Sequence, residues 1–385
     1  MSEHSPRPES STDPLGWQHV DHLQSFADGG RFDIHLRDWN NQDQCNQNGQ
    51  RSQDSQESQY GQEILVHNHN SQQRISWHLK TDAGTPTLHP QHPASAPLTA
   101  PDILAALEGA FTFFPQYRQL TLPSGPWPDT LRHRQILVPG ADGRPTIHRD
   151  MLWQLPELWL PVHKSPIPLS YRLSHGRQHP LRSSKPQGLL YRRHIPWLGK
   201  TLSFRALDID ADLERFHRWM NEPQVAKIWQ EQGSQEQHRQ YLHTLEKDPH
   251  IHPMIVCLDG EPFGYFEVYW AKEDRIAPFY DADDHDRGWH VLIGEPAYRG
   301  KAIAVAWFTA ISHYLFLDDP RTRRIVGEPR ADHVQQIRNL DRSGYAKLKT
   351  FDFPHKRALL VMLLRERFFG DALWWPAAEA PSPQH

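Results

Sequence analysis

The sequence predicts an α+β protein in which a loop-rich α+β N-terminal domain precedes a mixed central sheet flanked by helices. One observation is the order of elements over residues 200–370, where short apolar runs alternate with segments of helical period. That order is strand, helix, helix, strand, hairpin, strand, helix, strand, helix, strand. The other observation is the segment Arg287–Leu317, in which an apolar strand, a break and a long helix follow one another.

The N-terminal half is expected to contain a modest core. Alternating or β-rich residues predict three strands, at 31–37, 63–67 and 74–79. Apolar residues at helical spacing predict a helix over 102–114. The Gln/Asn/Ser-rich residues 40–62 predict a long exposed loop, and the Pro/His-rich residues 85–100 predict a linker. Residues 153–162 and 166–193 are expected to be packing segments and irregular chain, and this half shows no catalytic constellation.

The second half is expected to hold the sheet. Its strands are predicted at 202–206, 254–258, 262–269, 287–294 and 324–328. Its helices are predicted at 210–220, 235–245, 303–314 and 334–343. Asp259-Gly260 is a strong hairpin turn, and Gly344 ends the last helix. Residues 359–368 are expected to close the unit as a strand or a short helix.

Composition limits the class of protein. The net charge of −4 and the pI of about 6.7 argue against a nucleic-acid-binding protein, which would be strongly basic. The two cysteines, Cys45 and Cys257, form no CxxC motif, and no apolar run is long enough to span a membrane. The N-terminus lacks the apolar core of a signal peptide, so a cytoplasmic protein is expected. The 385 residues suffice for two domains, and we expect a tail at 1–15, the N-terminal domain at 16–195, the second domain at 200–372 and a tail at 376–385.

The segment after the strand at 287–294 has a pattern typical of a ligand site. Glu295 to Tyr298 breaks the strand, and Arg299-Gly300-Lys301-Ala302-Ile303-Ala304 leads into the next helix. Small residues let the backbone approach a ligand, and the N–H groups at a helix start favour a phosphate. The alternative is an ordinary strand–turn–helix in which Lys301 is only an exposed cation.

This segment resembles the acyl-CoA site of the GNAT superfamily of N-acetyltransferases, whose signature is Arg/Gln-x-x-Gly-x-Gly/Ala. Arg299 and Ala304 match the signature, while Ala302 stands where glycine is usual. The resemblance implies acetyl-CoA as co-substrate. Its pyrophosphate is then expected at Arg299, Gly300, Lys301, Ala302, Ile303 and Ala304, and its pantetheine along the backbone of Val291, Leu292 and Ile293.

Five further motifs lie on both sides of this segment, in the order expected of one family, at 264–270, 280–284, 286–290, 328–332 and 353–358. They resemble one branch of the superfamily, the acyltransferases of siderophore biosynthesis. The resemblance implies acetylation of N6-hydroxylysine or a related N-hydroxylated amine to a hydroxamate. Two alternatives remain: acylation of an N-hydroxydiamine or hydroxyornithine with a succinyl or longer chain, or a non-catalytic module that binds an acyl carrier or a synthetase. A siderophore synthetase and an amine hydroxylase are candidate partners.

His290 lies on the central strand, where the acyl group is expected to end. The resemblance implies an acid–base pair of a His and an Asp, which maps to His290 and Asp332. Glu267 and Trp289 are expected to contact the substrate. The alternative for His290 is a half-buried histidine whose ring is hydrogen-bonded within the fold and has no catalytic role. The alternative for Asp332 is a helix N-cap. The acidic loop 281–286 is expected either to attract a cationic amine or to be solvated, and no metal is expected.

Overall fold

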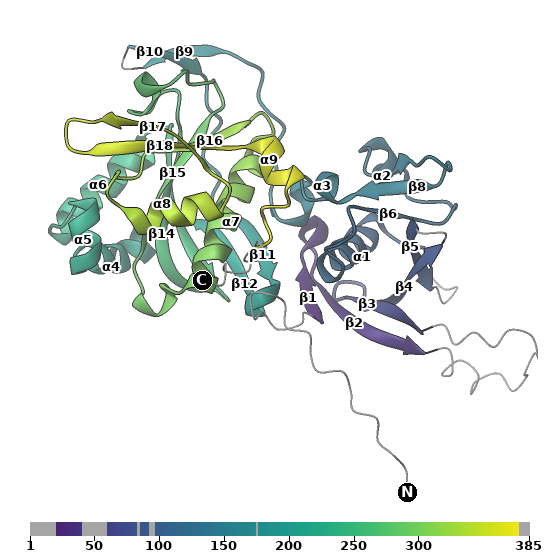
Figure 1. The fold of residues 1–385 in the computed structure, drawn as a ribbon. Helices are drawn as coiled ribbons and strands as arrows, with labels where there is room; N and C mark the ends of the chain where they lie inside the picture. The colour runs from purple at the N-terminus through teal and green to yellow at the C-terminus, as the bar shows by residue number, and fades with distance from the viewer. Residues whose placement is uncertain (1–20, 41–59, 83–84, 92–96, 175, 377–385) are drawn as a thin grey trace, which may run out of the picture. The chain divides into compact units, whose positions relative to one another are not determined.

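The computed structural model describes residues 21–40, 60–82, 85–91, 97–174 and 176–376. The chain divides into two compact units, one ending at Leu152 and the other spanning Trp153–Trp375 (Figure 1). The predicted α+β class is confirmed, since both units combine a sheet with helices. The tail expected at 1–15 and most of the loop expected at 40–62 lie outside the described residues, as does the tail after residue 376.

The first unit is built on an eight-stranded sheet of order β1-β2-β3-β4-β5-β6-β8-β7. Its strands are β1 (His22–Ser25), β2 (Phe32–Asn40), β3 (Tyr60–Asn68), β4 (Arg74–Asp82), β5 (Thr85–Gln91), β6 (Gln119–Thr121), β7 (Val138–Pro139) and β8 (Pro145–His148). The long helix α1 (Ala100–Phe113) packs on β2 and β3, and α2 (Asp129–His133) and α3 (Arg149–Leu152) are short (Figure 1). Gly109 permits the close approach of α1, because a Cβ there would lie 2.8 Å from Ile34 Cγ2.

Helix α1, which confirms the helix predicted over 102–114, begins at a capping box. The Thr99 hydroxyl accepts a hydrogen bond from the Asp102 backbone N–H, and the Asp102 carboxylate accepts one from the Thr99 N–H. Asp102 also accepts a 2.7 Å hydrogen bond from Asn68 Nδ2. This buried bond ties the start of α1 to the end of β3.

The three strands predicted in the first half are present as β2, β3 and β4. The linker predicted at 85–100 is wrong over 85–91, because these residues form β5. This strand pairs with β4 along its length and with β6 at a single residue pair. One side of β5 is therefore nearly unpaired, as in an edge strand. Pro86 and Pro90, which have no backbone N–H to donate, cost few hydrogen bonds between strands at such a position.

The second unit contains an eight-stranded sheet of order β11-β12-β13-β14-β15-β16-β18-β17. Its strands are β11 (Leu189–Ile195), β12 (Lys200–Ala206), β13 (Ile251–Leu258), β14 (Glu261–Trp270), β15 (Arg287–Ile293), β16 (Arg324–Gly327), β17 (Ala346–Asp352) and β18 (Arg357–Leu364). Its helices are α4 (Ile209–Met220), α5 (Pro223–Trp229), α6 (Gln235–Lys247), α7 (Lys301–Asp318), α8 (Val334–Arg342) and α9 (Arg365–Gly370). Neighbouring strands are antiparallel except β15 and β16, which are parallel and joined through α7.

Helices cover both faces of this sheet. On one face, Leu213 and Phe216 of α4 pack in a cluster with Tyr265 of β14 and Leu292 of β15. On the other face, Trp307 of α7 packs against rings of β14 and β15. Side chains alternate along β15, so His290 shares the α4 face with Leu292.

Several elements of the second unit differ from the sequence prediction. The irregular chain expected at 166–193 contains the hairpin β9 (Tyr171–Ser174) and β10 (Arg177–Pro180) and the start of β11. The second unit begins at Trp153, whereas the sequence placed the boundary near residue 200. Residues before 200 belong to it because β11 pairs with β12 and the Trp153 carbonyl lies 2.7 Å from His313 Nε2 of α7. Strand β17 was not predicted, and residues 359–368 form the end of β18 followed by most of α9.

Candidate active site

The parallel strands β15 and β16 separate after two residue pairs. Arg287 pairs with Ile325 and Gly288 with Val326, and the described residues show no further pair between these strands. On its other side, β15 stays paired with β14 as far as Ile293. The outer half of β15 therefore presents an edge on which an extended ligand can lie as an added strand.

His290 lies in this outer half between two carboxylates. Its Nδ1 is 3.3 Å from Glu267 Oε2, and its Nε2 is 3.0 Å from Glu328 Oε1. Glu267 is the direct partner of His290 on β14, and Glu328 directly follows β16. The His290 side chain is 24% exposed, whereas those of Glu267 and Glu328 are 6% and 1% exposed. Within this His290 cluster (His290, Glu267 and Glu328), the imidazole is thus the group most accessible to a ligand.

Fixed donors hold both carboxylates of the His290 cluster. They are Tyr241 at 2.5 Å and Tyr265 at 2.9 Å for Glu267, and Tyr269 at 2.9 Å and Arg275 at 3.3 Å for Glu328. A buried carboxylate is costly unless it is paired and hydrogen-bonded, so these donors make the arrangement possible. They also leave the carboxylates little freedom to rotate away from His290.

Electrostatics favour an imidazolium at this position. Burial alone would lower the pKa of His290, but attraction to Glu328 and Glu267 outweighs burial and raises the pKa to about 9. Burial would raise the pKa of Glu328, yet His290, Lys356 and Arg275 hold it well below its usual range. The pKa of Glu267 is also lowered despite burial, chiefly by its bond to His290. At neutral pH the cluster is therefore a charged imidazole between two carboxylates.

The structure does not bring Asp332, the predicted partner of His290, to the imidazole. The Asp332 side chain is 70% exposed and accepts hydrogen bonds of 3.0 and 2.9 Å from Arg330. Both ring nitrogens of His290 are instead occupied by the cluster carboxylates. Asp332 is also not the helix cap, since His333 holds the N-cap position of α8 and makes no side-chain cap bond.

Trp289, a predicted substrate contact, faces the opposite side of the sheet from His290. Its side chain is buried, its ring packs edge-on against Trp307 of α7, and its Nε1 donates a 3.0 Å hydrogen bond to Tyr345 Oη. Of the two predicted substrate contacts, only Glu267 contacts His290. The aromatic rings near His290 are those of Tyr269 and Trp229, at centroid distances of 4.9 and 6.3 Å.

The start of α7 has the features expected of a phosphate site. Gly300 is its N-cap and makes no side-chain cap bond. Nothing lies within 4 Å of the position that a Gly300 Cβ would take, so the space beside it is open. Lys301 is exposed, and Ala302, Ile303 and Ala304 are partly exposed. A helix start of this kind offers backbone N–H groups and a positive dipole end to an anion.

Arg299 has a structural place next to this helix start. Its Nε donates to the Ile293 carbonyl at 3.0 Å, and its guanidinium also binds Gln224 at 2.9 Å and Glu222 at 3.1 Å. These contacts join the end of β15 to the start of α5. In this structure Arg299 thus shapes the loop between Val291–Ile293 and the start of α7.

The acidic loop 281–286 has a buried end and a solvated part. Asp286 is buried and accepts hydrogen bonds of 2.9 and 2.8 Å from Arg324. Asp281 and Asp283 are exposed. The solvated loop of the sequence prediction is therefore present only in part, and the buried end is an ion pair within the fold.

Sequence reasoning missed Glu328 and three tyrosines as members of the site. Glu328 follows a strand that runs parallel to the strand of His290, and the pairing of those two strands is a property of the whole sheet. Tyr265 and Tyr269 flank Glu267 at a spacing of two, which places all three on one face of β14. Tyr241 comes from a helix that no local pattern connects to the site.

Comparison with known proteins agrees with this geometry. Residues 208–353 match a family model described as an acetyltransferase (GNAT) domain. Protein C17G9.06c of Schizosaccharomyces pombe is 45% identical over 230 residues, which are 60% of this chain and 69% of that protein. An Escherichia coli N(6)-hydroxylysine O-acetyltransferase is 40% identical over 268 residues, covering 69% of this chain and 84% of that protein. The N(5)-hydroxyornithine:cis-anhydromevalonyl coenzyme A-N(5)-transacylase SIDF of Beauveria bassiana is 44% identical over 195 residues, which are 50% of this chain and 43% of that protein.

The separated parallel strands, the uncapped helix start and the matched family model define an acyltransferase. The chain belongs to the GNAT acetyltransferase family, which confirms the resemblance seen in its sequence. Within the family, proteins named for hydroxylysine or hydroxyornithine transfer are among its similar sequences. No helix among the described residues has the length and apolar character needed to cross a membrane.

Proposed function

We propose that the protein is an acetyl-CoA-dependent N-acyltransferase of hydroxamate siderophore biosynthesis, which acetylates N6-hydroxylysine or a related N-hydroxylated amine. The supporting observation is the His290 cluster at the opening between β15 and β16. The chain's 40% identity over 268 residues to a protein named for N6-hydroxylysine supports the substrate class.

Acetyl-CoA fits the open edge of β15 and the start of α7. Its pantetheine amides would pair with the backbone of Val291, Leu292 and Ile293, as an added strand does. Its pyrophosphate would lie at the α7 start, Arg299 to Ala304, where N–H groups and open space are present. Bound in this way, the coenzyme would present its thioester acyl group toward His290.

The chemistry of a hydroxylamine suits the charge state of His290. The nitrogen of a hydroxylamine is much less basic than that of lysine, whose pKa is about 10.4, so it is neutral near pH 7. The protein then has to orient this nitrogen and stabilise the negative charge that develops on the carbonyl oxygen. Both N–H groups of the His290 imidazolium face carboxylates, and the Nδ1 contact with Glu267 is the longer at 3.3 Å. The Nδ1–H would therefore turn from Glu267 to the N–OH group or to that oxygen. The reaction forms a C–N bond, breaks the thioester C–S bond and leaves the proton lost by nitrogen on the thiol.

Asp332 remains our proposed contact for the amine rather than a partner of the imidazole. Its exposed carboxylate lies on the segment that continues from Glu328, and a charged partner such as a substrate ammonium could compete with Arg330 for it. We also propose a cytoplasmic, metal-independent reaction at a site within residues 200–372, which form the larger part of the second unit. An amine hydroxylase would supply the substrate, and a siderophore synthetase would consume the hydroxamate.

A second candidate is acylation on oxygen, which the name of the Escherichia coli relative indicates. The two reactions give different products from the same substrate. Acylation on nitrogen retains the N–OH group and yields a hydroxamate that binds Fe³⁺, whereas acylation on oxygen removes the free hydroxyl.

The test measures thiol release from acetyl-CoA with N6-hydroxylysine, lysine and hydroxyputrescine, and assays each product for a coloured ferric hydroxamate. We expect N6-hydroxylysine to exceed lysine by roughly 10⁴-fold in kcat/KM, because a site built to bond a hydroxyl rejects its absence strongly. Equal turnover of lysine and hydroxylysine would contradict the proposal. A product without ferric-hydroxamate colour would favour acylation on oxygen.

A further inference from the structure

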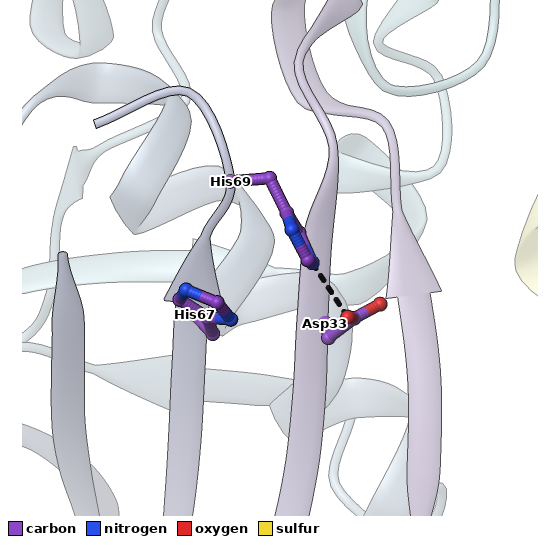
Figure 2. A group of neighbouring side chains, drawn as sticks. All are labelled: Asp33, His67 and His69. Carbon is purple, nitrogen blue, oxygen red and sulfur yellow. Dashed lines mark hydrogen bonds and ion pairs between the residues drawn. The ribbon is translucent and has the colours of Figure 1, made fainter. Parts of the chain in front are cut away.

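The first unit carries a group of metal-ligating side chains that acyl transfer does not use. Asp33 of β2, His67 of β3 and His69 of the turn after β3 each place one donor atom within 4.8 Å of the other two. Figure 2 shows His69 reaching from the turn toward Asp33, with His67 on the adjacent strand. We call these three residues the Asp33 cluster.

Strand register fixes two members of the cluster. Asp33 and His67 are direct partners in the antiparallel pair β2–β3. Side chains alternate along a strand, and the neighbouring Phe32, Ile34 and Val66 are buried. Asp33 and His67 therefore project together from the face that turns away from the core.

The turn that carries His69 is held in place by its own hydrogen bonds. The His69 backbone N–H donates to the Arg31 carbonyl at 3.0 Å. The Asn68 side chain accepts hydrogen bonds from the N–H groups of Asn70 and Ser71, at 2.9 and 3.2 Å, and donates to the buried Asp102. The backbone that positions His69 is thus anchored to the core rather than left as a free loop.

The distances within the cluster are close to those of a bound divalent ion. The rings of His67 and His69 have centroids 4.5 Å apart, and two imidazoles on one tetrahedral Zn²⁺ have centroids roughly 5 Å apart, given Zn–N lengths of about 2.0–2.1 Å. Donor atoms on such an ion are about 3.3 Å apart, whereas the donors here lie within 4.8 Å of one another. Side-chain rotations would have to bring them closer by up to about 1.5 Å. His69 Nε2 already lies 2.5 Å from Asp33 Oδ2, and an ion would replace that hydrogen bond.

Outer contacts of the kind seen around metal ligands are also present. Gln24 Nε2 of β1 donates to Asp33 Oδ1 at 3.3 Å and so orients the carboxylate. His22 Nε2 lies 4.0 Å from the same oxygen, close enough to serve as a fourth ligand after rotation. Two imidazoles and one carboxylate are a donor set that suits Zn²⁺ and similar borderline ions better than Ca²⁺ or Mg²⁺.

We propose that Asp33, His67 and His69 form a binding site for one divalent transition-metal ion, with Zn²⁺ as the best fit. The site would link β2, β3 and the following turn. The sequence predicted no metal because its ligands follow no recognised metal-site spacing and the chain's 26 histidines appeared scattered. The inference rests on the first unit alone and holds or fails independently of the acyltransferase proposal.

The test is titration of the metal-free full-length protein with Zn²⁺ by calorimetry, repeated with Co²⁺ to record its visible absorption. We expect one saturable site per chain, and a Co²⁺ spectrum of low coordination number. The double variant His67→Gln/His69→Gln and the single variant Asp33→Asn should weaken that site at least tenfold, which corresponds to the loss of one or more ligands. The matched control His133→Gln changes an exposed histidine of the same unit and should leave binding unchanged.

Three results would overturn the proposal. They are no saturable binding, equal binding by wild type and the cluster variants, and equal weakening by the His133→Gln control. Weak binding of several ions that all variants share would be adventitious binding to other histidines. Thermal unfolding of each variant without metal would show whether it is folded, and Asp33→Asn provides a test that changes no histidine.

Discussion

Replacing Glu328 by glutamine should lower the pKa of His290 and thereby remove the imidazolium at neutral pH. Glu328 Oε1 lies 3.0 Å from His290 Nε2, and at an effective dielectric constant of about 20 that attraction is roughly 5 kcal/mol. The pKa of His290 is raised from 6.5 to about 9, which corresponds to about 3 kcal/mol because burial opposes the two carboxylates. Removal of the Glu328 charge removes more than this net shift, so the pKa should fall below 7.

The assay is an NMR titration of the His290 Cε1–H signal, assigned by its absence from the spectrum of His290→Gln. Asp332→Asn is the matched control, since it neutralises an exposed carboxylate shortly after Glu328 that does not contact His290. The control should leave the His290 titration unchanged. A His290 that still titrated near pH 9 in Glu328→Gln, or an equal shift of its pKa in both variants, would show that Glu328 does not hold the imidazolium.

Three further predictions follow from the same structure. The folded-state pKa of His290 is raised, so its contribution to the free energy of unfolding is complete below about pH 6.5 and is lost as the pH rises through about 9. In urea unfolding, the free energy of unfolding of the wild type should therefore fall by up to about 3 kcal/mol over this range, and that of His290→Gln should lack this fall. Ala302→Glu places bulk and negative charge at the start of α7 and should weaken acetyl-CoA binding at least tenfold by calorimetry, because roughly 1.4 kcal/mol of repulsion suffices for that. A fragment of residues 153–376 should melt as a folded unit, whereas a fragment of residues 195–376 should lose most of its stability because it lacks β11, whose Tyr191 hydroxyl lies 3.1 Å from His313 Nδ1.

Each of these predictions has a result that would count against it. If the free energy of unfolding of wild type and of His290→Gln changed with pH in the same way, the pKa of His290 would not shift on folding. Unchanged acetyl-CoA affinity of a folded Ala302→Glu would remove the α7 start from the coenzyme site, and Ala346→Glu on exposed β17 controls for added charge. Equal melting temperatures of the two fragments would show that β11 is dispensable.

Elements with a complete local signal could be predicted from the sequence. Helix α1 has its capping residues and helical period within its own segment, and the β13–β14 hairpin is specified by Asp259-Gly260 between two apolar runs. Elements that depend on pairing partners could not be predicted. Strand β17 is mostly exposed and rich in lysine, and its place is set by pairing with β18. Strand β5 contains two prolines and is recognisable only once β4 is beside it.

The same distinction applies to the site. His290 was predicted because one strand and its following turn carry a family pattern, and both lie within a single short segment. The role of Glu328 depends on the parallel pairing of β15 with β16, which brings together residues 38 positions apart. Asp332 was chosen from nearly the same segment, but the chain turns after Glu328 and leaves Asp332 at the surface. The contact of Tyr241 with Glu267 depends on how α6 packs on the sheet.

The turnover of His290→Ala with N6-hydroxylysine, measured together with its affinity for acetyl-CoA, tests whether His290 acts in the chemistry and not in coenzyme binding. We predict that kcat falls by roughly 10²–10⁴, the usual effect of removing a positioned acid or base. Acetyl-CoA affinity should change by less than about twofold, or about 0.4 kcal/mol, because the coenzyme is proposed to bind strand backbone and the start of α7. Full activity of His290→Ala, or loss of acetyl-CoA binding in a folded variant, would contradict the separation of chemistry at His290 from coenzyme binding along β15 and α7.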